Sequence, residues 1–305
     1  MFMNRFSASD IASFLNRPLI GDDFEINRVC SIKKLKSNSV CFIDTPLSIV
    51  IAPLNLLVLT TQNNLLVNHQ DCSYVSVINP REAFAKVVER FFYIQQSGIS
   101  PSAVIGNNVT IGEGVFVGNN VTIEHDCNIG NNTSIDHGSV IGWGTTIGSN
   151  CRIGAGVVIA NEGLGSFFDS SGTLMSIRHL GCVIIQNNVE IGPLSTIARG
   201  TIDETFIGEN THIGPQVNIG HNSIIGIHCL IAGRSHISGS VTIGANSRLW
   251  ANCTIKDYVK VASNATIGMG ARVSHDVPER VTVASLPSID LKKLAKFVHM
   301  TKWGR

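Results

Sequence analysis

The chain has 305 residues, enough for two domains, and a formal net charge of +1. With no basic run in the sequence, this balance argues against a nucleic-acid-binding protein. The longest apolar stretch, from Leu47 to Leu59, contains Pro53 and Asn55 and is too short for a membrane span. The first five residues do not begin an apolar signal sequence, so we expect a cytoplasmic protein.

Residues 1–98 show no repeat, and we interpret them as a small α/β domain. The first predicted element is a helix that ends at Phe14, with Ser7 or Ser9 as its cap. Short strands follow around Glu25–Cys30, Val40–Ile43, Leu56–Thr60 and Tyr74–Val77. After Asn79-Pro80 we predict a helix over Ala83–Tyr93 and then a linker at Gln95–Ser100.

Residues 99–276 carry an aliphatic residue at every sixth position, in more than twenty hexads. The period runs from Ile105 to Ile159, returns at Ile185, Ile191 and Ile197, and continues from Ile207 to Val273. A fixed hexapeptide period predicts a parallel β-helix, in which each hexad is a short strand followed by a corner. Glycine and asparagine at the corners fit this interpretation, because both tolerate a positive φ. Two segments interrupt the period: a long loop at 161–184, and 199–206, which adds four residues to one hexad.

Residues 277–305 form a C-terminal tail in which we predict one short helix, Ile289–Met300. The eight cysteines show no disulfide or metal-ligand spacing, so we expect no metal site. Four of them fall on the small, inward fifth position of a hexad and are interpreted as buried hydrophobic residues: Cys127, Cys151, Cys229 and Cys253.

The layout resembles the LpxD family of N-acyltransferases over nearly the whole chain. The resemblance rests on the first helix, the Asn79-Pro80 helix and the segments Ile159–Gly165, Val189–Gly192, Thr196–Gly200, Thr205–Gly208 and Val217–Asn222. The last of these segments matches the one that carries the catalytic histidine of the family.

The resemblance implies a mainly β fold: a left-handed parallel β-helix with three hexads per coil, followed by a short helix. It also implies that the small α/β domain before the β-helix, residues 1–98, is of the nucleotide-binding type. It also implies a homotrimer with active sites in the clefts between subunits. The reaction would move an acyl group from acyl-CoA or acyl carrier protein, as co-substrate, to the amine of a nucleotide-linked amino sugar. No bound cofactor is expected.

Several positions depart from the family pattern. The N-terminal domain offers Phe42 where the family has an aromatic pair that holds uracil, Asp257-Tyr258 replace a second histidine, and Gly214-Pro215 replace an acidic residue. The C-terminal helical region is also shorter. These departures favour an acceptor sugar destined for O-antigen or capsule. The alternatives are LpxD proper, in lipid A synthesis, and a non-catalytic or carbonic-anhydrase-like solenoid.

We predict His221 as the general base, because imidazole can accept a proton from an attacking amine near pH 7. His221 occupies the third position of its hexad, so its side chain should project outward from a corner. Gly239 follows by one 18-residue coil, and its backbone N–H is the predicted donor to the oxyanion. His125, in a segment that resembles the histidine segment of the related O-acyltransferases, is the rival base.

The other candidate site residues are predicted to bind substrate. Asn222 would fix either the sugar or the base, and His228 is close enough in sequence to assist. Asp203 and Glu204 would bind the amine or the hydrated phosphates, or are solvated loop carboxylates. Phe42 would stack on the nucleotide base. The loop at 161–181 would clamp the pantetheine arm or the sugar of a neighbouring subunit.

Overall fold

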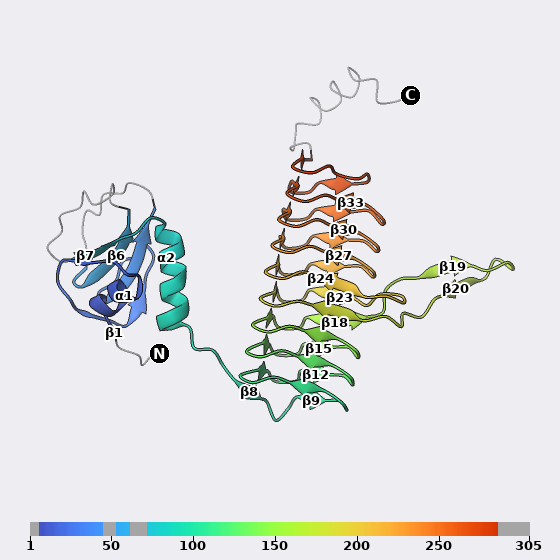
Figure 1. Ribbon diagram of the computed structural model, residues 1–305, viewed down its shortest axis with the longest axis horizontal. Helices are drawn as coiled ribbons and strands as arrows, with labels where there is room; N and C mark the ends of the chain where they lie inside the picture. Colours follow the sequence, from blue (N-terminus) through green and yellow to red (C-terminus); the bar gives the residue numbers. More distant parts are fainter. Residues whose placement is uncertain (1–5, 45–52, 62–71, 286–305) are drawn as a thin grey trace, which may run out of the picture. The chain divides into compact units, whose positions relative to one another are not determined.

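The computed structural model describes residues 6–44, 53–61 and 72–285, and the chain divides into two compact units, 1–95 and 96–305 (Figure 1). Each unit is described by itself. The expected C-terminal helix, Ile289–Met300, lies outside the described residues.

The N-terminal unit is built on a five-stranded sheet in the order β2-β7-β6-β5-β4. Its strands are β2 (Leu19–Ile20), β4 (Arg28–Val29), β5 (Ser39–Ile43), β6 (Leu56–Thr60) and β7 (Cys72–Ser76), and a separate pair joins β1 (Phe6–Ser7) to β3 (Glu25–Ile26). All neighbours in the sheet are parallel except β2 and β7. The three central strands, β5, β6 and β7, are buried on both faces, as is typical of parallel strands, whereas the edge strands β2 and β4 are largely exposed.

Two helices cover one face of this sheet. Ser7 caps α1 (Ala8–Phe14) in a capping box with Asp10. Asn79 caps α2 (Pro80–Val87), which continues as a π-helix, η2 (Val88–Phe92). This helix begins three residues earlier than predicted, because Pro80 is suited to the first helical turn and Asn79 accepts a hydrogen bond from the Glu82 N–H.

The second unit is a parallel β-helix whose strands stack into three sheets (Figure 1). The first sheet contains β8 (Gly98–Ile99), β11 (Phe116–Val117), β14 (Ser134–Ile135), β17 (Arg152–Ile153), β22 (Glu190–Ile191), β25 (His212–Ile213), β28 (Leu230–Ile231), β31 (Arg248–Leu249), β34 (Thr266–Ile267) and β36 (Thr282–Val283). The second contains β9 (Val104–Ile105), β12 (Thr122–Ile123), β15 (Val140–Ile141), β18 (Val158–Asn161), β23 (Thr196–Ala198), β26 (Asn218–Ile219), β29 (His236–Ile237), β32 (Thr254–Ile255) and β35 (Arg272–Val273). The third contains β10 (Thr110–Ile111), β13 (Asn128–Ile129), β16 (Thr146–Ile147), β21 (Val183–Ile185), β24 (Thr205–Ile207), β27 (Ile224–Ile225), β30 (Thr242–Ile243) and β33 (Lys260–Val261).

The hexad residues meet in register inside the coil. Ile123 pairs with Ile141, and Ile141 with Ile159, so each aliphatic side chain packs on its equivalents in the coils above and below. These residues are fully buried, as are the four cysteines predicted to point inward. The corners take left-handed backbone conformations, with φ of 57° at Asn120. The predicted mainly β fold with a parallel β-helix is therefore confirmed. Strand pairing also continues to Val283, beyond residue 276, where the sequence predicts that the β-helix ends.

The long interruption forms a hairpin. β19 (Ser166–Phe168) pairs antiparallel with β20 (Leu174–Ser176), and the hairpin projects from the side of the β-helix (Figure 1). The hairpin leaves after a register shift at the end of β18, where Ala160 has a φ of 61°. In the second interruption, 199–206, residues 199–204 form a bulge between β23 and β24, and residues 205 and 206 begin β24. No helix in the described ranges is long and apolar enough to cross a membrane.

Candidate active site

His221 lies at the corner that follows the second sheet, beside a pocket of about 380 Å³ that we call the His221 pocket. Its walls come from the start of the long loop and from four successive coils. The lining residues are Asn161, Glu162, Gly163, Leu164, Ala198, Asn218, Gly220, His221, His236, Ser238, Gly239 and Asp257. The pocket therefore gathers residues almost 100 positions apart in the sequence, because the coils stack and the loop returns over them.

Asn222 determines which nitrogen of His221 carries the proton. The Thr201 N–H and hydroxyl both lie 3.0 Å from Asn222 Oδ1. A backbone N–H can only donate, which identifies the amide oxygen as the acceptor. His221 Nδ1 lies 3.1 Å from the same oxygen and must therefore donate its proton to it. The neutral ring then keeps its lone pair on Nε2. Asn222 thus contacts the ring predicted to be the base, while its two predicted roles, fixing the sugar or fixing the base, stay predictions.

Gly239 lies against His221, as the 18-residue coil predicts, since Asn218 pairs with His236. A Cβ built on Gly239 would lie 2.6 Å from His221 Nε2, so only glycine leaves this nitrogen open. The Gly239 N–H, however, donates to Asp257 Oδ1 at 3.0 Å. The role of this N–H as the oxyanion donor stays a prediction, and in this conformation the Asp257 carboxylate occupies it. The reason is geometric: Asp257 occupies the same corner one coil further along.

His179 is a second histidine of this region, which the sequence analysis missed. It comes from the returning end of the long loop and is only 2% exposed. Its ring lies edge-to-face against His221, with ring centroids 5.0 Å apart and an interplanar angle of 67°. Burial, followed by the charge of His221, lowers the pKa of His179 below its ordinary value, with Glu162 acting in the opposite direction.

The lowered pKa of His179 predicts that the folded protein becomes less stable as the pH decreases. The folded protein binds fewer protons at this site than the unfolded chain, in which histidine titrates near pH ~6.5. The free energy of unfolding should therefore decrease as the pH falls through about 6.5, and the decrease should end below the folded-state pKa. Urea unfolding of the wild type and of His179→Gln between about pH 7.5 and pH 5 tests this. The wild type should show the steeper loss, and parallel curves would contradict the prediction.

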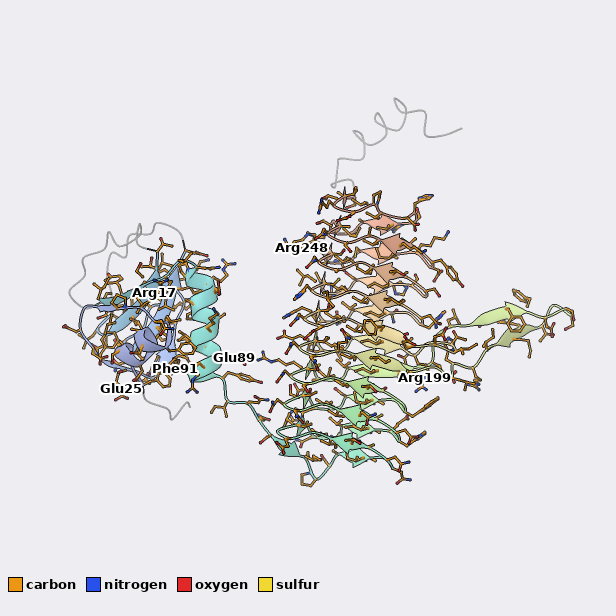
Figure 2. All side chains as sticks on the ribbon, viewed as in Figure 1. Arg17, Glu25, Glu89, Phe91, Arg199 and Arg248 are labelled. Atoms are coloured by element: carbon orange, nitrogen blue, oxygen red, sulfur yellow. The ribbon has the colours of Figure 1, made fainter. Side chains whose placement is uncertain are left out.

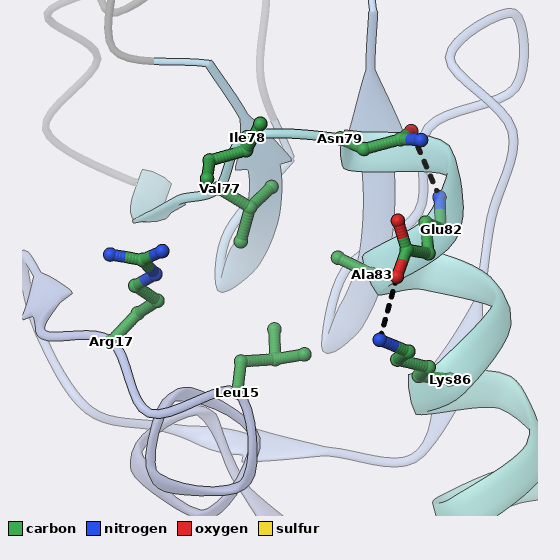
Figure 3. A pocket seen from close by; sticks show the side chains of 8 residues that line it. All are labelled: Leu15, Arg17, Val77, Ile78, Asn79, Glu82, Ala83 and Lys86. Atoms are coloured by element: carbon green, nitrogen blue, oxygen red, sulfur yellow. Dashed lines mark hydrogen bonds and ion pairs between the residues drawn. The ribbon is translucent and has the colours of Figure 1, made fainter.

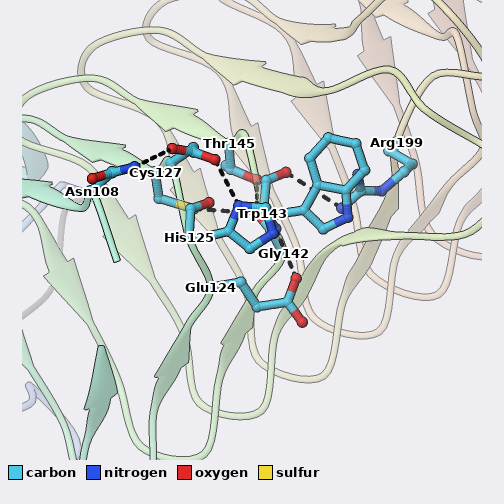
Figure 4. Close-up of polar contacts among 9 residues, drawn as sticks. Asn108, Glu124, His125, Cys127, Gly142, Trp143, Thr145 and Arg199 are labelled. Carbon is cyan, nitrogen blue, oxygen red and sulfur yellow. Dashed lines mark hydrogen bonds and ion pairs between the residues drawn. The ribbon is translucent and has the colours of Figure 1, made fainter. Parts of the chain in front are cut away.

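Arg199 lies one coil below His221 and is 2% exposed (Figure 2). Its Nε donates to the Ala160 carbonyl at 2.8 Å, and its terminal nitrogens donate to the Gly181 and Trp143 carbonyls at 3.4 Å. The guanidinium also lies 3.9 Å from the centroid of the Trp143 ring (Figure 4). Arg199 thus binds the carbonyls at the two ends of the long loop, before residue 161 and after residue 180.

His125, the rival base, lies at the same corner but on the far side of Trp143. Its ring stacks on Trp143 at 5.9 Å, and its Nδ1 lies 2.7 Å from Asp126 Oδ2 (Figure 4). It is four coils from His221, roughly 19 Å at the usual strand spacing. The two histidines therefore do not share one reacting group, and His125 does not line the His221 pocket.

The structure does not bring the other predicted substrate contacts to this pocket. Asp203 and Glu204 are exposed in the bulge and do not line it. His228 is exposed beyond β27, in the third sheet, because six residues of the coil advance the chain to the next face. Within the described residues, no group of three or more His, Cys, Asp or Glu side chains is arranged to hold a metal ion.

Phe42 belongs to the N-terminal unit. Its ring packs on Phe84, with centroids 5.0 Å apart, and the Arg81 guanidinium lies 6.0 Å from the Phe42 centroid. A separate pocket of about 260 Å³ opens between α1 and α2, and Phe42 does not line it. Its lining residues are Leu15, Arg17, Val77, Ile78, Asn79, Glu82, Ala83 and Lys86 (Figure 3). Stacking of Phe42 on a nucleotide base stays a prediction.

Comparison with known proteins identifies the family. The chain is 42% identical over 242 residues to the UDP-3-O-acylglucosamine N-acyltransferase of Campylobacter lari, with 74% of this chain and 76% of the relative covered. It is 36% identical over 234 residues to the enzyme of the same name from Helicobacter pylori, with coverage of 70% and 68%. The chain belongs to the UDP-3-O-acylglucosamine N-acyltransferase family. The predicted LpxD-like resemblance is confirmed.

Other members of the family match over a shorter segment. The Bradyrhizobium enzyme of strain BTAi1 is 49% identical over 76 residues, which is 25% of this chain and 21% of that protein. The match thus spans about a fifth of the length of that relative. Residues 222–257 match the family described as bacterial transferase hexapeptide (six repeats), and residues 87–164 match the GMPPB C-terminal domain.

Solved structures share the fold. The UDP-N-acetylglucosamine acyltransferase of Francisella novicida has a TM-score of 0.56 at 24% identity, covering 66% of this chain and 73% of that one. The UDP-N-acetylglucosamine O-acyltransferase (LpxA) of Moraxella catarrhalis has a TM-score of 0.57 at 20% identity, with coverage of 68% and 79%. The likeness agrees with the predicted left-handed coil.

Proposed function

We propose that this chain is an enzyme that transfers an acyl group from an acyl thioester to the amine of UDP-3-O-acylglucosamine. The family relationship supports this acceptor better than the O-antigen or capsule sugar that the departures in sequence favour. The observation that carries the proposal is His221, whose hydrogen bond to Asn222 leaves the Nε2 lone pair free beside the His221 pocket.

In the proposed reaction, the sugar amine attacks the thioester carbonyl and a C–N bond forms. His221 Nε2 accepts the proton that the nitrogen loses. The tetrahedral intermediate then collapses, the C–S bond breaks, and the thiolate leaves and takes up the proton. The oxyanion needs a preorganised donor. The Gly239 N–H can serve if the Asp257 carboxylate moves away from it, which makes Asp257 a group that substrate must displace.

The surroundings of His221 suit a substrate with polar and apolar parts. Asn218, His236 and Ser238 bring polar side chains to the His221 pocket, while Leu164, 83% exposed, brings an apolar one. We include the homotrimer in the proposal, with a neighbouring subunit facing the exposed corner. Acyl-CoA and acyl carrier protein both remain candidate donors.

The test is a thiol-release assay with acyl-CoA and acyl carrier protein thioesters against UDP-3-O-acylglucosamine and a dTDP-linked deoxyamino sugar. Turnover with the UDP-linked acceptor, and formation of an amide seen by mass spectrometry, is the expected result. Turnover with the deoxyamino sugar alone would show that the acceptor is that sugar and not UDP-3-O-acylglucosamine. No thiol release from any pair would remove the proposal of an acyltransferase.

A further inference from the structure

We propose that His179 is a positioning residue for His221: it remains a neutral ring and holds the plane of the base by edge-to-face packing. This inference rests on the proposed function, since it treats His221 as the base. It adds a residue that neither the hexad period nor the family segments single out.

Packing contributes more than hydrogen bonding to holding the His179 ring in place. Neither of its ring nitrogens has a hydrogen-bond partner among the residues that the structure describes, although both are fully buried. Burying polar atoms without hydrogen-bond partners destabilises the folded protein, so the imidazole is kept at this position despite an energetic cost. Its ring contacts His221, and the Ile177 backbone is a further polar neighbour of the ring.

The long loop closes over both rings through two glycines. A Cβ on Gly163 would lie 2.8 Å from His221 Cδ2 and 2.9 Å from His179 Nε2. A Cβ on Gly165 would lie 3.1 Å from His179 Cε1. The loop backbone is therefore pressed against both imidazoles. A five-membered ring fits this space, whereas a phenylalanine would push the loop outward.

The chain around His179 is tied to the residues that orient His221. The Ile177 N–H donates to the Gly165 carbonyl at 2.7 Å, and the Leu180 N–H donates to the Thr201 carbonyl at 2.8 Å. Thr201 is the residue that fixes Asn222, and through it Nδ1 of His221. The base is thus held on one edge by a hydrogen bond and on one side by the His179 ring.

The surroundings of His179 favour its neutral ring. Burial and the nearby Arg199 disfavour a charged His179, Glu162 favours it, and Glu162 is itself 3.0 Å from Arg178. Two imidazoles 5.0 Å apart repel each other when both are charged. A neutral His179 therefore leaves His221 free to accept the proton of the amine.

The test uses the full-length protein with His179→Ala, and His212→Ala as the matched control. His212 is exposed on the first sheet beside Glu190, away from the His221 pocket. We expect His179→Ala to lower kcat by about 10- to 100-fold with KM changed less than about twofold, because a misplaced base slows the chemical step more than binding. His212→Ala should match the wild type.

Added azoles distinguish a positioning ring from a proton carrier. Imidazole and pyrazole can both fill the cavity, but pyrazole stays uncharged near neutral pH. We expect both to restore kcat in His179→Ala. Rescue by imidazole alone, or by neither azole, overturns the proposal, as does a full wild-type kcat without any azole. A rise in KM with unchanged kcat would overturn it as well, by assigning His179 to substrate binding.

A measurement independent of turnover completes the test. In ¹⁵N NMR spectra of the histidine rings, His221 should be the Nδ1–H tautomer in the wild type and a mixture in His179→Ala. If that variant does not fold, His179→Gln takes its place, and an unchanged kcat and tautomer there overturn the proposal. Should the wild type show no acyl transfer, the proposed function fails while the NMR result still decides the role of His179.

Discussion

Replacing His221 by alanine is expected to lower kcat by roughly 10²- to 10⁴-fold, the usual contribution of a general base. The expectation rests on the tautomer, because Asn222 accepts the Nδ1 proton and leaves only Nε2 able to receive one. KM should change little, since the ring does not bury the substrate by itself. Steady-state thiol release with saturating acyl donor measures the loss. A variant that keeps more than about a tenth of the wild-type kcat would contradict the assignment.

His125→Ala is the matched control for this experiment. Both histidines stand at the same corner of the β-helix, and both were predicted from sequence as candidate bases. His125 is separated from His221 by the Trp143 and Arg199 side chains. Its replacement should leave kcat within about threefold of the wild type, whereas a loss equal to that of His221→Ala would move the reacting group toward Trp143.

The fold could be predicted from sequence because one local rule is repeated. Each hexad needs one inward aliphatic residue and one corner residue that tolerates a positive φ. A single residue type in the sequence indicates each requirement: Ile123 is an inward residue and Asn120 is a corner residue. The same period places Gly239 and Asp257 at the corner of His221. The 18-residue spacing alone therefore predicts that Asp257 lies next to the Gly239 N–H.

The rest of the site depends on where the interruptions return. His179 meets His221 because the hairpin closes on itself and the chain rejoins the coil beside Thr201, and no period encodes that path. In the sequence, only Gly163 and Gly165 hint at this contact, because two glycines separated by one residue suggest that the backbone comes close to another group. His228, by contrast, was placed near His221 by sequence distance alone, and the coil carries it to another face.

Arg199 presents two opposing effects on stability. Burial of its guanidinium lowers the pKa of the side chain, which shows that leaving water is costly for the charge. Replacing a buried charge by an apolar side chain can therefore stabilise a protein. Against this, Arg199 binds the Ala160 and Gly181 carbonyls at the two ends of the loop and stacks on Trp143.

We expect the second effect to dominate, so that Arg199→Met lowers the free energy of unfolding by about 2–4 kcal/mol. The Ala160 carbonyl, bonded at 2.8 Å, would be left buried without its donor, at a cost of about 1–3 kcal/mol, and a desolvated cation–π contact adds up to about 2 kcal/mol. Urea unfolding measures the change, and hydrogen exchange over residues 161–181 should quicken. Arg199→Lys is the control: it keeps the charge but loses the planar fork, and its stability should lie between the other two. If Arg199→Met were instead as stable as the wild type, the cost of burying the guanidinium would equal all that its contacts contribute. The two ends of the loop would then be held by the coil alone.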